Sequence, residues 1–129
     1  SLSGMTRVTG KAEIVRAALD CIAYQITDLV LAMEQDTGIP MKELRVDGGP
    51  ARNRYLMQFQ SDMLGSEVLV SDSEEMSAIG AACAAGIVLG ILPADVTEQI
   101  KRTAYHPQMD EELRIKKWNG WKRAVVSIL

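Results

Sequence analysis

The stretch that decides the fold reads KELRVDGGPARNRYLMQFQSDMLG and covers residues 42–65. In its first part Leu44 and Val46 alternate with polar residues, which is the pattern of a half-buried strand. A pair of glycines follows, and after it apolar residues recur at helical spacing. We therefore expect a strand over 43–47 that turns at once into a helix.

The turn between this strand and the helix is a candidate ligand site. Gly48 and Gly49 allow backbone angles and close approaches that a Cβ atom would prevent. Pro50 suits the first turn of a helix, where its missing N–H group costs nothing. The helix predicted over 51–64 directs its free N–H groups and positive dipole end back at the glycines, an arrangement that favours phosphate groups.

The turn by itself permits two interpretations: a site that binds a phosphate group, or a tight connection that binds nothing. The chain has neither a P-loop nor a G-x-G-x-x-G dinucleotide fingerprint. A tight connection between strand and helix that binds nothing is the common case among short loops.

The rest of the chain is predicted to be mainly helical. A second strand over 67–71 would complete a βαβ unit with parallel strands and a right-handed crossover. Residues 76–92 are uncharged and rich in Ala and Gly, which indicates a buried helix, since a membrane span needs about 20 apolar residues. Further helices are expected over 11–36, ended by Gly38 and Pro40, over about 95–103, and over about 109–127, with Trp118 and Trp121 as core anchors.

Several motifs keep a fixed order from about Thr9 to Trp121. They are AALDCIAYQ at 17–25, LRVDGG at 44–49, Asn53, LMQFQSDMLG at 56–65, AIGAA at 78–82 and the pair Ala85-Gly86. In this order and spacing the chain resembles the C-terminal part of the FGGY carbohydrate kinases, and most closely those members that phosphorylate glycerol.

The resemblance implies an α/β fold, part of a ribonuclease-H-like (actin-like ATPase) domain that is mostly helical with two parallel strands. Residues 1–129 would be the C-terminal part of the second, nucleotide-binding domain, without its preceding strands and without the N-terminal domain. The implied activity is transfer of the γ-phosphoryl group of ATP to a hydroxyl group, with glycerol as the expected acceptor and Mg²⁺ screening the phosphates.

The resemblance also implies the nucleotide contacts. In the family the second glycine of the pair and the Asn four residues later contact the nucleotide, which gives Gly49 and Asn53, with Gly48 in the same turn. Asp47 is expected to cap the turn rather than to act as a base, because the family's catalytic Asp lies in a stretch absent from this chain. No catalytic residue or metal ligand is expected here, and the isolated chain should be inactive.

Departures from the family pattern keep other functions open. Cys83 replaces a large aromatic residue, and Arg52 replaces a small or polar one; Arg52 is expected to point to water rather than to phosphate. The acceptor can instead be xylulose, gluconate or a deoxysugar. A non-catalytic α/β association module, in which the glycines serve geometry alone, is the alternative from another class.

Composition limits the binding partners and the cellular location that we expect. The formal net charge of −3 gives no reason to expect a nucleic acid or an anionic membrane. Cys21 and Cys83 stand far apart in apolar helical patterns, as reduced thiols of a cytoplasmic protein do. His106 is expected on a surface loop. The strand at 43–47 would keep an open edge, so the isolated chain is expected to form a homo-oligomer.

Overall fold

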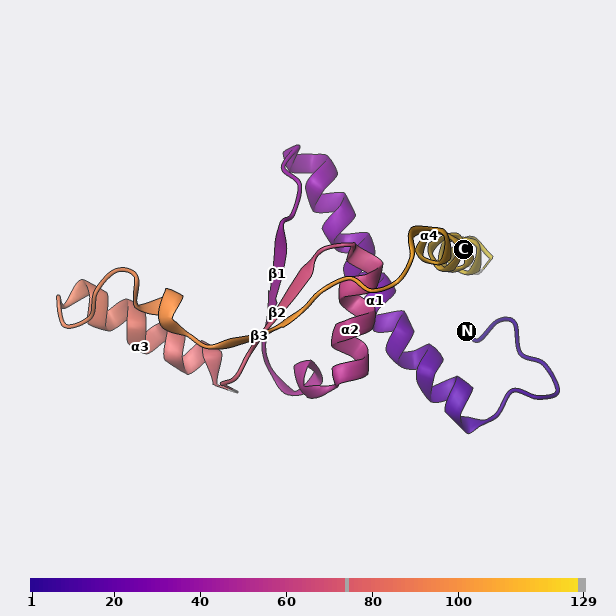
Figure 1. Cartoon of the computed structure of the whole chain (residues 1–129), viewed down its shortest axis with the longest axis horizontal. Helices are drawn as coiled ribbons and strands as arrows, with labels where there is room; N and C mark the ends of the chain where they lie inside the picture. The colour runs from indigo at the N-terminus through magenta and orange to yellow at the C-terminus, as the bar shows by residue number, and fades with distance from the viewer. Residues whose placement is uncertain (74, 128–129) are drawn as a thin grey trace.

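The computed structural model describes residues 1–73 and 75–127. Figure 1 shows the elements, which are in order α1 (Lys11–Thr37), β1 (Glu43–Val46), the 3₁₀ turn η1 (Gly49–Arg52), α2 (Arg54–Leu64), β2 (Glu67–Ser71), α3 (Met76–Val88), the 3₁₀ turn η2 (Val96–Gln99), β3 (Arg102–Tyr105) and α4 (Glu111–Val126). The helices expected at the start, in the middle and at the end of the chain are therefore present, as are both expected strands.

The sheet has the strand order β1-β2-β3. Strands β1 and β2 are parallel, with Leu44 opposite Val68, so the predicted parallel pair is confirmed. Strand β3 was not predicted; it pairs antiparallel with β2, with Tyr105 opposite Val68. The helix expected over about 95–103 is wrong beyond η2, because pairing with the free edge of β2 overrides the weak local preference of this short segment.

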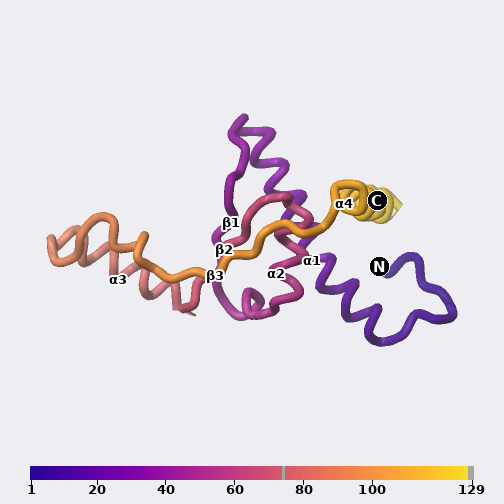
Figure 2. Tube along the Cα trace, in the orientation of Figure 1, coloured from indigo at the N-terminus to yellow at the C-terminus, as the bar shows by residue number. Residues whose placement is uncertain are grey.

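The core lies where α2 meets α1 and the sheet. Its buried members are Ala23 from α1, Ala51 from η1, Leu56, Met57, Phe59 and Met63 from α2, and Val68 from β2. Figure 2 traces α2 between α1 and the strands. The glycine turn is therefore attached directly to the best-packed part of the molecule.

Helix α1 packs through a face of small and polar residues, while several of its large apolar side chains stay exposed. Its buried residues are Ala23, Thr27 and Val30, whereas Leu29 and Met33 are 61% and 57% exposed. The small side chain of Ala23 lets α2 approach closely, and Gln60 of α2 donates to the Ala23 carbonyl and to the Thr27 hydroxyl, each at 3.3 Å. Close approach and buried hydrogen bonds, rather than apolar content, select this face.

Helix α4 is held against α1 and α2 by its tryptophans, as predicted. Trp121 stacks on Tyr24 with ring centroids 5.3 Å apart, and its indole Nε1 donates to Asp28 at 2.6 Å. The segment that leads into α4 is fixed by Asp62 of α2, whose buried carboxylate accepts the backbone N–H groups of Gln108 and Met109 at 2.7 and 3.2 Å.

The expectation of a buried helix at 76–92 is wrong. Helix α3 and the segment after it project from the sheet, away from α1 and α2 (Figure 1), and among its described residues only Cys83 and Gly86 are buried. Leu92 folds back onto Gly86, where an added Cβ would lie 2.6 Å from Leu92 Cδ1. The small residues do permit close approach, but within the described chain they are approached by their own following segment. No helix of the described residues combines the length and apolar character needed to span a membrane.

Candidate functional site: the glycine turn before α2

The glycine turn joins the end of β1 to α2 through one turn of 3₁₀ helix. Gly48 has φ 87° and ψ 178°, a conformation that is essentially limited to glycine. The turn is closed by the Ala51 N–H group, which donates to the Gly48 carbonyl at 3.1 Å. Ala51 is buried in the core, so the turn is attached to the core through this residue. The opposite side of the turn faces solvent.

At Gly48 the missing side chain permits the backbone conformation, whereas at Gly49 it leaves open space. It lies on the exposed side of the turn, and a Cβ built on it would have no heavy atom within 4 Å. The protein's own packing therefore does not require glycine at this position. The open space above it is available to a flat ligand group approaching the backbone.

Asn53 occupies a different position from the expected one. The helix predicted over 51–64 would contain it, but it is the N-cap of α2, and its side-chain oxygen accepts from the Leu56 N–H group at 3.1 Å. Because the first intrahelical bond is donated by Met57 to the Asn53 carbonyl at 3.0 Å, the amides of Arg54 and Tyr55 have no acceptor within the helix. The helix start thus keeps donors, including the Asn53 side-chain NH₂ group, for an anionic or polar ligand.

Asp47 does not cap the turn as expected. It is exposed, and in residues 1–73 and 75–127 its carboxylate makes no hydrogen bond to the turn, which is closed by the backbone instead. Arg52 is exposed. His106 is also on the surface as predicted, with its Nδ1 3.3 Å from Glu67.

A cluster that the sequence did not reveal fixes the first turn of α2 to α1. The Tyr55 hydroxyl donates to Asp20 and accepts from Arg16 Nε at 2.9 Å. The Arg16 guanidinium also lies 5.1 Å from the centre of the Tyr55 ring. Arg16 and Asp20 stand four residues apart on α1, a spacing that indicates an ion pair, but nothing in the sequence indicates that Tyr55 joins them.

The surroundings of the tyrosines favour the neutral phenol. Burial raises the pKa of Tyr55 to about 12, and its hydrogen bond to Asp20 acts in the same direction. Burial likewise raises the pKa of Tyr24 to about 12, with the nearby charge of Asp20 adding to the effect. Both phenols therefore remain neutral at physiological pH, and the Tyr55 hydroxyl links α2 to α1 through its hydrogen bond to Asp20.

A small hollow adjoins Asp47, the residue that precedes the turn. A hollow of about 130 Å³ lies at the carboxyl ends of β1 and β2 and is lined by Arg45, Val46, Asp47, Leu69, Ser71, Met76 and Arg102. Small-molecule sites usually measure about 300–1,000 Å³, so this hollow is too small to enclose a nucleotide. Within the described residues no three His, Cys, Asp or Glu side chains are grouped as a metal site would require.

The sequence places the chain in a known family. Residues 1–89 match the C-terminal domain of the FGGY family of carbohydrate kinases, and the chain belongs to this family. Among individual relatives, it is 48% identical over 128 residues to a glycerol kinase of Petrotoga mobilis and 44% identical over 128 residues to one of Deinococcus radiodurans, covering 97% of this chain and 26% of each relative.

Solved structures agree with this assignment. The glycerol kinase of Plasmodium falciparum, crystallised with ADP, matches 100% of this chain and 26% of its own, with a TM-score of 0.90 and 36% identity. A xylulose kinase of Rhodospirillum rubrum matches 99% of this chain and 27% of its own, with a TM-score of 0.82 and 22% identity, and supports the fold. The expected actin-like fold class is confirmed, and the chain spans about a quarter of the length of these relatives.

Proposed function

We propose that residues 1–129 are the C-terminal part of the nucleotide-binding domain of an ATP-dependent kinase whose acceptor is glycerol. The observation that carries this proposal is the Gly48-Gly49 turn before an Asn-capped helix, in a chain 48% identical to a glycerol kinase along nearly all of its length. ATP would supply the phosphoryl group, and the acceptor hydroxyl would receive it. Mg²⁺ ligands, the base and the acceptor-binding residues are expected outside this chain.

The residues of the turn suit a nucleotide. Gly49 leaves space for a ligand against the backbone, and Asn53 keeps its NH₂ group for hydrogen bonding while its oxygen caps α2. The α2 start adds unpaired N–H groups and the positive end of the helix dipole, which favour phosphate. Gly48 shapes the turn, and Ala51 and Tyr55 hold it in place.

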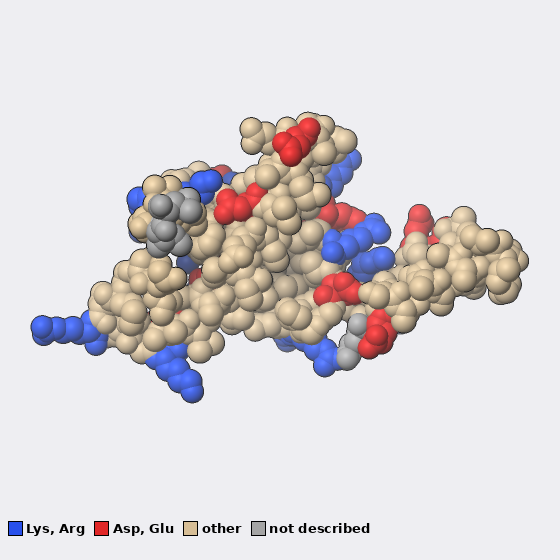
Figure 3. Space-filling view, turned by 180° about the vertical axis from the view of Figure 1, so that it is seen from behind, with Lys and Arg blue, Asp and Glu red and all other residues tan. Residues whose placement is uncertain are grey.

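The cysteines and the distribution of charged side chains bear on the location and the partners of the protein. We propose a cytoplasmic location, supported by the two free cysteines, Cys21 and Cys83. On the face shown in Figure 3, Lys and Arg side chains are scattered among Asp and Glu rather than gathered, which supports a small-molecule rather than a nucleic-acid ligand.

Nucleotide binding is tested by titrating Mg·ATP into isotope-labelled chain 1–129 and following backbone amide shifts. We expect weak binding, with shifts concentrated at Gly48, Gly49 and Asn53, since half a cleft buries little of the ligand. Gly49→Val fills the open space and should abolish these shifts. Asn53→Asp keeps an oxygen for the Leu56 N–H group but loses the NH₂ donor and adds a negative charge, so it should abolish them without unfolding α2.

Two outcomes would count against the proposal. Shifts that persist in both variants would place the nucleotide elsewhere, and an absence of shifts at millimolar Mg·ATP would favour the association module. The purified chain should not phosphorylate glycerol, because it lacks the base; substantial ATP-dependent phosphorylation would contradict the division of roles proposed here. In the longer protein, a higher kcat/KM for xylulose or gluconate than for glycerol would reassign the acceptor.

A further inference from the structure

Tyr55 takes part in the candidate site both through its backbone and through its side chain. It is the second residue of α2, and its backbone N–H group is one of those at the helix start that have no acceptor within the helix. Its hydroxyl donates to Asp20 of α1 and accepts from Arg16 Nε at 2.9 Å. A single residue therefore connects a donor of the proposed nucleotide site to the neighbouring helix.

The Tyr55 hydroxyl is held by two charged side chains that also approach each other. Arg16 Nε lies 4.0 Å from Asp20 Oδ2, and the Arg16 guanidinium lies 5.1 Å from the centre of the Tyr55 ring. The Asp20 side chain is only 14% exposed, so water competes little for its carboxylate. Because each of the three groups contacts the other two, the network defines where the hydroxyl lies.

Packing of the Tyr55 ring does not require the hydroxyl. The ring stacks on Phe59 with centroids 5.9 Å apart and planes 7° from parallel, and a phenylalanine would keep this contact. The hydroxyl therefore adds direction rather than volume. It acts at the first turn of α2, where the backbone makes the fewest hydrogen bonds and where helices fray most readily.

A second contact between α1 and α2 holds a different part of α2. Gln60 donates to the Ala23 carbonyl and to the Thr27 hydroxyl. Gln60 lies more than one turn further along α2 than Tyr55. These bonds therefore fix the middle of the helix, whereas the Tyr55 hydroxyl fixes its start.

We infer that Tyr55 is a positioning residue for the nucleotide, held in place by Asp20 and Arg16. Its hydroxyl fixes the first turn of α2, and with it the unpaired N–H groups and the Asn53 NH₂ group, before the ligand arrives. Donors that are already ordered bind more tightly, because less conformational entropy is lost on binding. This inference rests on the proposed nucleotide site, and it gives a role there to side chains that need not touch the ligand.

The test measures steady-state kinetics of the longer kinase. Tyr55→Phe should raise KM for ATP about fivefold, the effect of losing one hydrogen bond. Its kcat and its KM for glycerol should change less than about twofold, since only nucleotide binding is weakened. Asp20→Ala should match Tyr55→Phe, whereas Asp20→Asn keeps an oxygen acceptor and should restore most of the affinity.

Tyr24→Phe is the matched control. It also removes a half-buried tyrosine hydroxyl from the contact between α1 and its neighbours, but in the described residues that hydroxyl makes no hydrogen bond. Its KM for ATP should equal that of the wild type. The double variant Y55F/D20A should have the same KM for ATP as either single variant, because both changes remove the same bond.

Hydrogen exchange provides a readout without nucleotide. In chain 1–129, Tyr55→Phe should speed exchange of the Leu56 amide, which is bonded to Asn53, because the first turn opens more often. Amides over Phe59–Met63 should keep their wild-type rates. NMR measures both sets in one sample, and equal acceleration throughout α2 would show that the hydroxyl serves general stability rather than the position of the helix start.

The outcomes separate this inference from the nucleotide site itself. If Gly49→Val and Asn53→Asp raise KM for ATP but Tyr55→Phe does not, the site stands and the positioning role is overturned. If Gly49→Val and Asn53→Asp leave KM for ATP unchanged, both proposals fail. A Tyr24→Phe variant that behaves like Tyr55→Phe, or a fall in kcat equal to the rise in KM, would also overturn the positioning role.

Discussion

Gly48 and Gly49 are adjacent and identical, yet the structure gives them different roles. Gly48 has φ 87° and ψ 178°, where any side chain would be strained. Gly49 is not among the glycines with positive φ, and a Cβ there would meet nothing within 4 Å. The fold therefore requires the first glycine, whereas the second leaves open space above the backbone.

Alanine substitution separates these two roles. Gly48→Ala should lower the free energy of unfolding by about 1–3 kcal/mol, the usual cost of forcing a side chain into such a conformation. Gly49→Ala is the matched control and should change it by less than about 0.5 kcal/mol. Urea unfolding followed by tryptophan fluorescence measures both, and a comparable loss for Gly49→Ala would show that the turn conformation is assigned to the wrong residue.

At the scale of elements, α2 and α3 differ in burial. Helix α2 is buried along most of its length, from Leu56 to Met63, and contacts α1, the sheet and the segment before α4. Helix α3 is more apolar in composition, yet Val88 and Leu89 at its end are 86% and 72% exposed. Composition indicates that a helix will be buried only when there is a neighbouring element to bury it.

Hydrogen exchange should reveal this difference. Amides of α3 should exchange far faster than those of α2, since local opening of α3 breaks few tertiary contacts whereas opening of α2 disrupts the core. Mass spectrometry of peptides covering 76–88 and 54–64 gives the comparison. Equal protection of the two helices at low protein concentration would mean that α3 is packed in solution.

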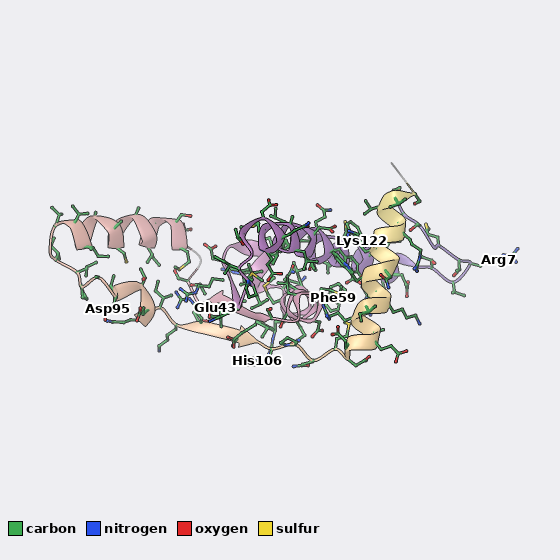
Figure 4. All side chains as sticks on the ribbon, turned by 90° about the horizontal axis from the view of Figure 1, so that it is seen from above. Arg7, Glu43, Phe59, Asp95, His106 and Lys122 are labelled. Carbon is green, nitrogen blue, oxygen red and sulfur yellow. The ribbon has the colours of Figure 1, made fainter. Side chains whose placement is uncertain are left out.

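At the scale of the whole molecule, aromatic contacts join three helices that lie far apart in sequence. Tyr24 of α1 stacks on Trp121 of α4 and meets the edge of Phe59 of α2, with ring centroids 5.3 and 5.5 Å apart. Phe59 lies between α2 and α4 in Figure 4, and Tyr55 links α2 back to α1. Tyr24 therefore contacts both other helices, and Tyr55 adds a second link between α1 and α2.

These tyrosines make the fold sensitive to alkali. A phenol whose pKa is higher in the folded than in the unfolded chain stabilises the fold below the unfolded value, and that contribution is lost as the pH rises through the folded value. Tyr24 and Tyr55 have folded pKa values of about 12 against a usual 10.0.

The free energy of unfolding should therefore fall as the pH rises from 10.0 to about 12. The fall should be shallower in Tyr55→Phe, which keeps the ring and loses the ionisable group. Urea unfolding at a series of pH values measures the slope. An unchanged slope in Tyr55→Phe would show that Tyr55 does not carry this dependence.

Much of the secondary structure of the chain is determined by its local sequence. Alternation at Leu44 and Val46, the paired glycines and the helical spacing after them define a strand, a turn and a helix through interactions within a few residues, and α1, β2 and α4 arise in the same way. The family motifs likewise identified the candidate site, because Gly48, Gly49 and Asn53 lie within one short segment.

Tertiary structure decided what depends on distant neighbours. Arg102–Tyr105 became a strand because β2 offered a free edge, and α1 packed through Ala23 and Thr27 because small side chains allow close approach. Tyr55 joined Asp20 and Arg16 across 35 and 39 positions of sequence, and α3 stayed exposed for lack of a packing partner within the described chain. Local hydrogen bonding and side-chain periodicity depend on residues close together in the sequence, whereas burial depends on which surfaces meet in three dimensions.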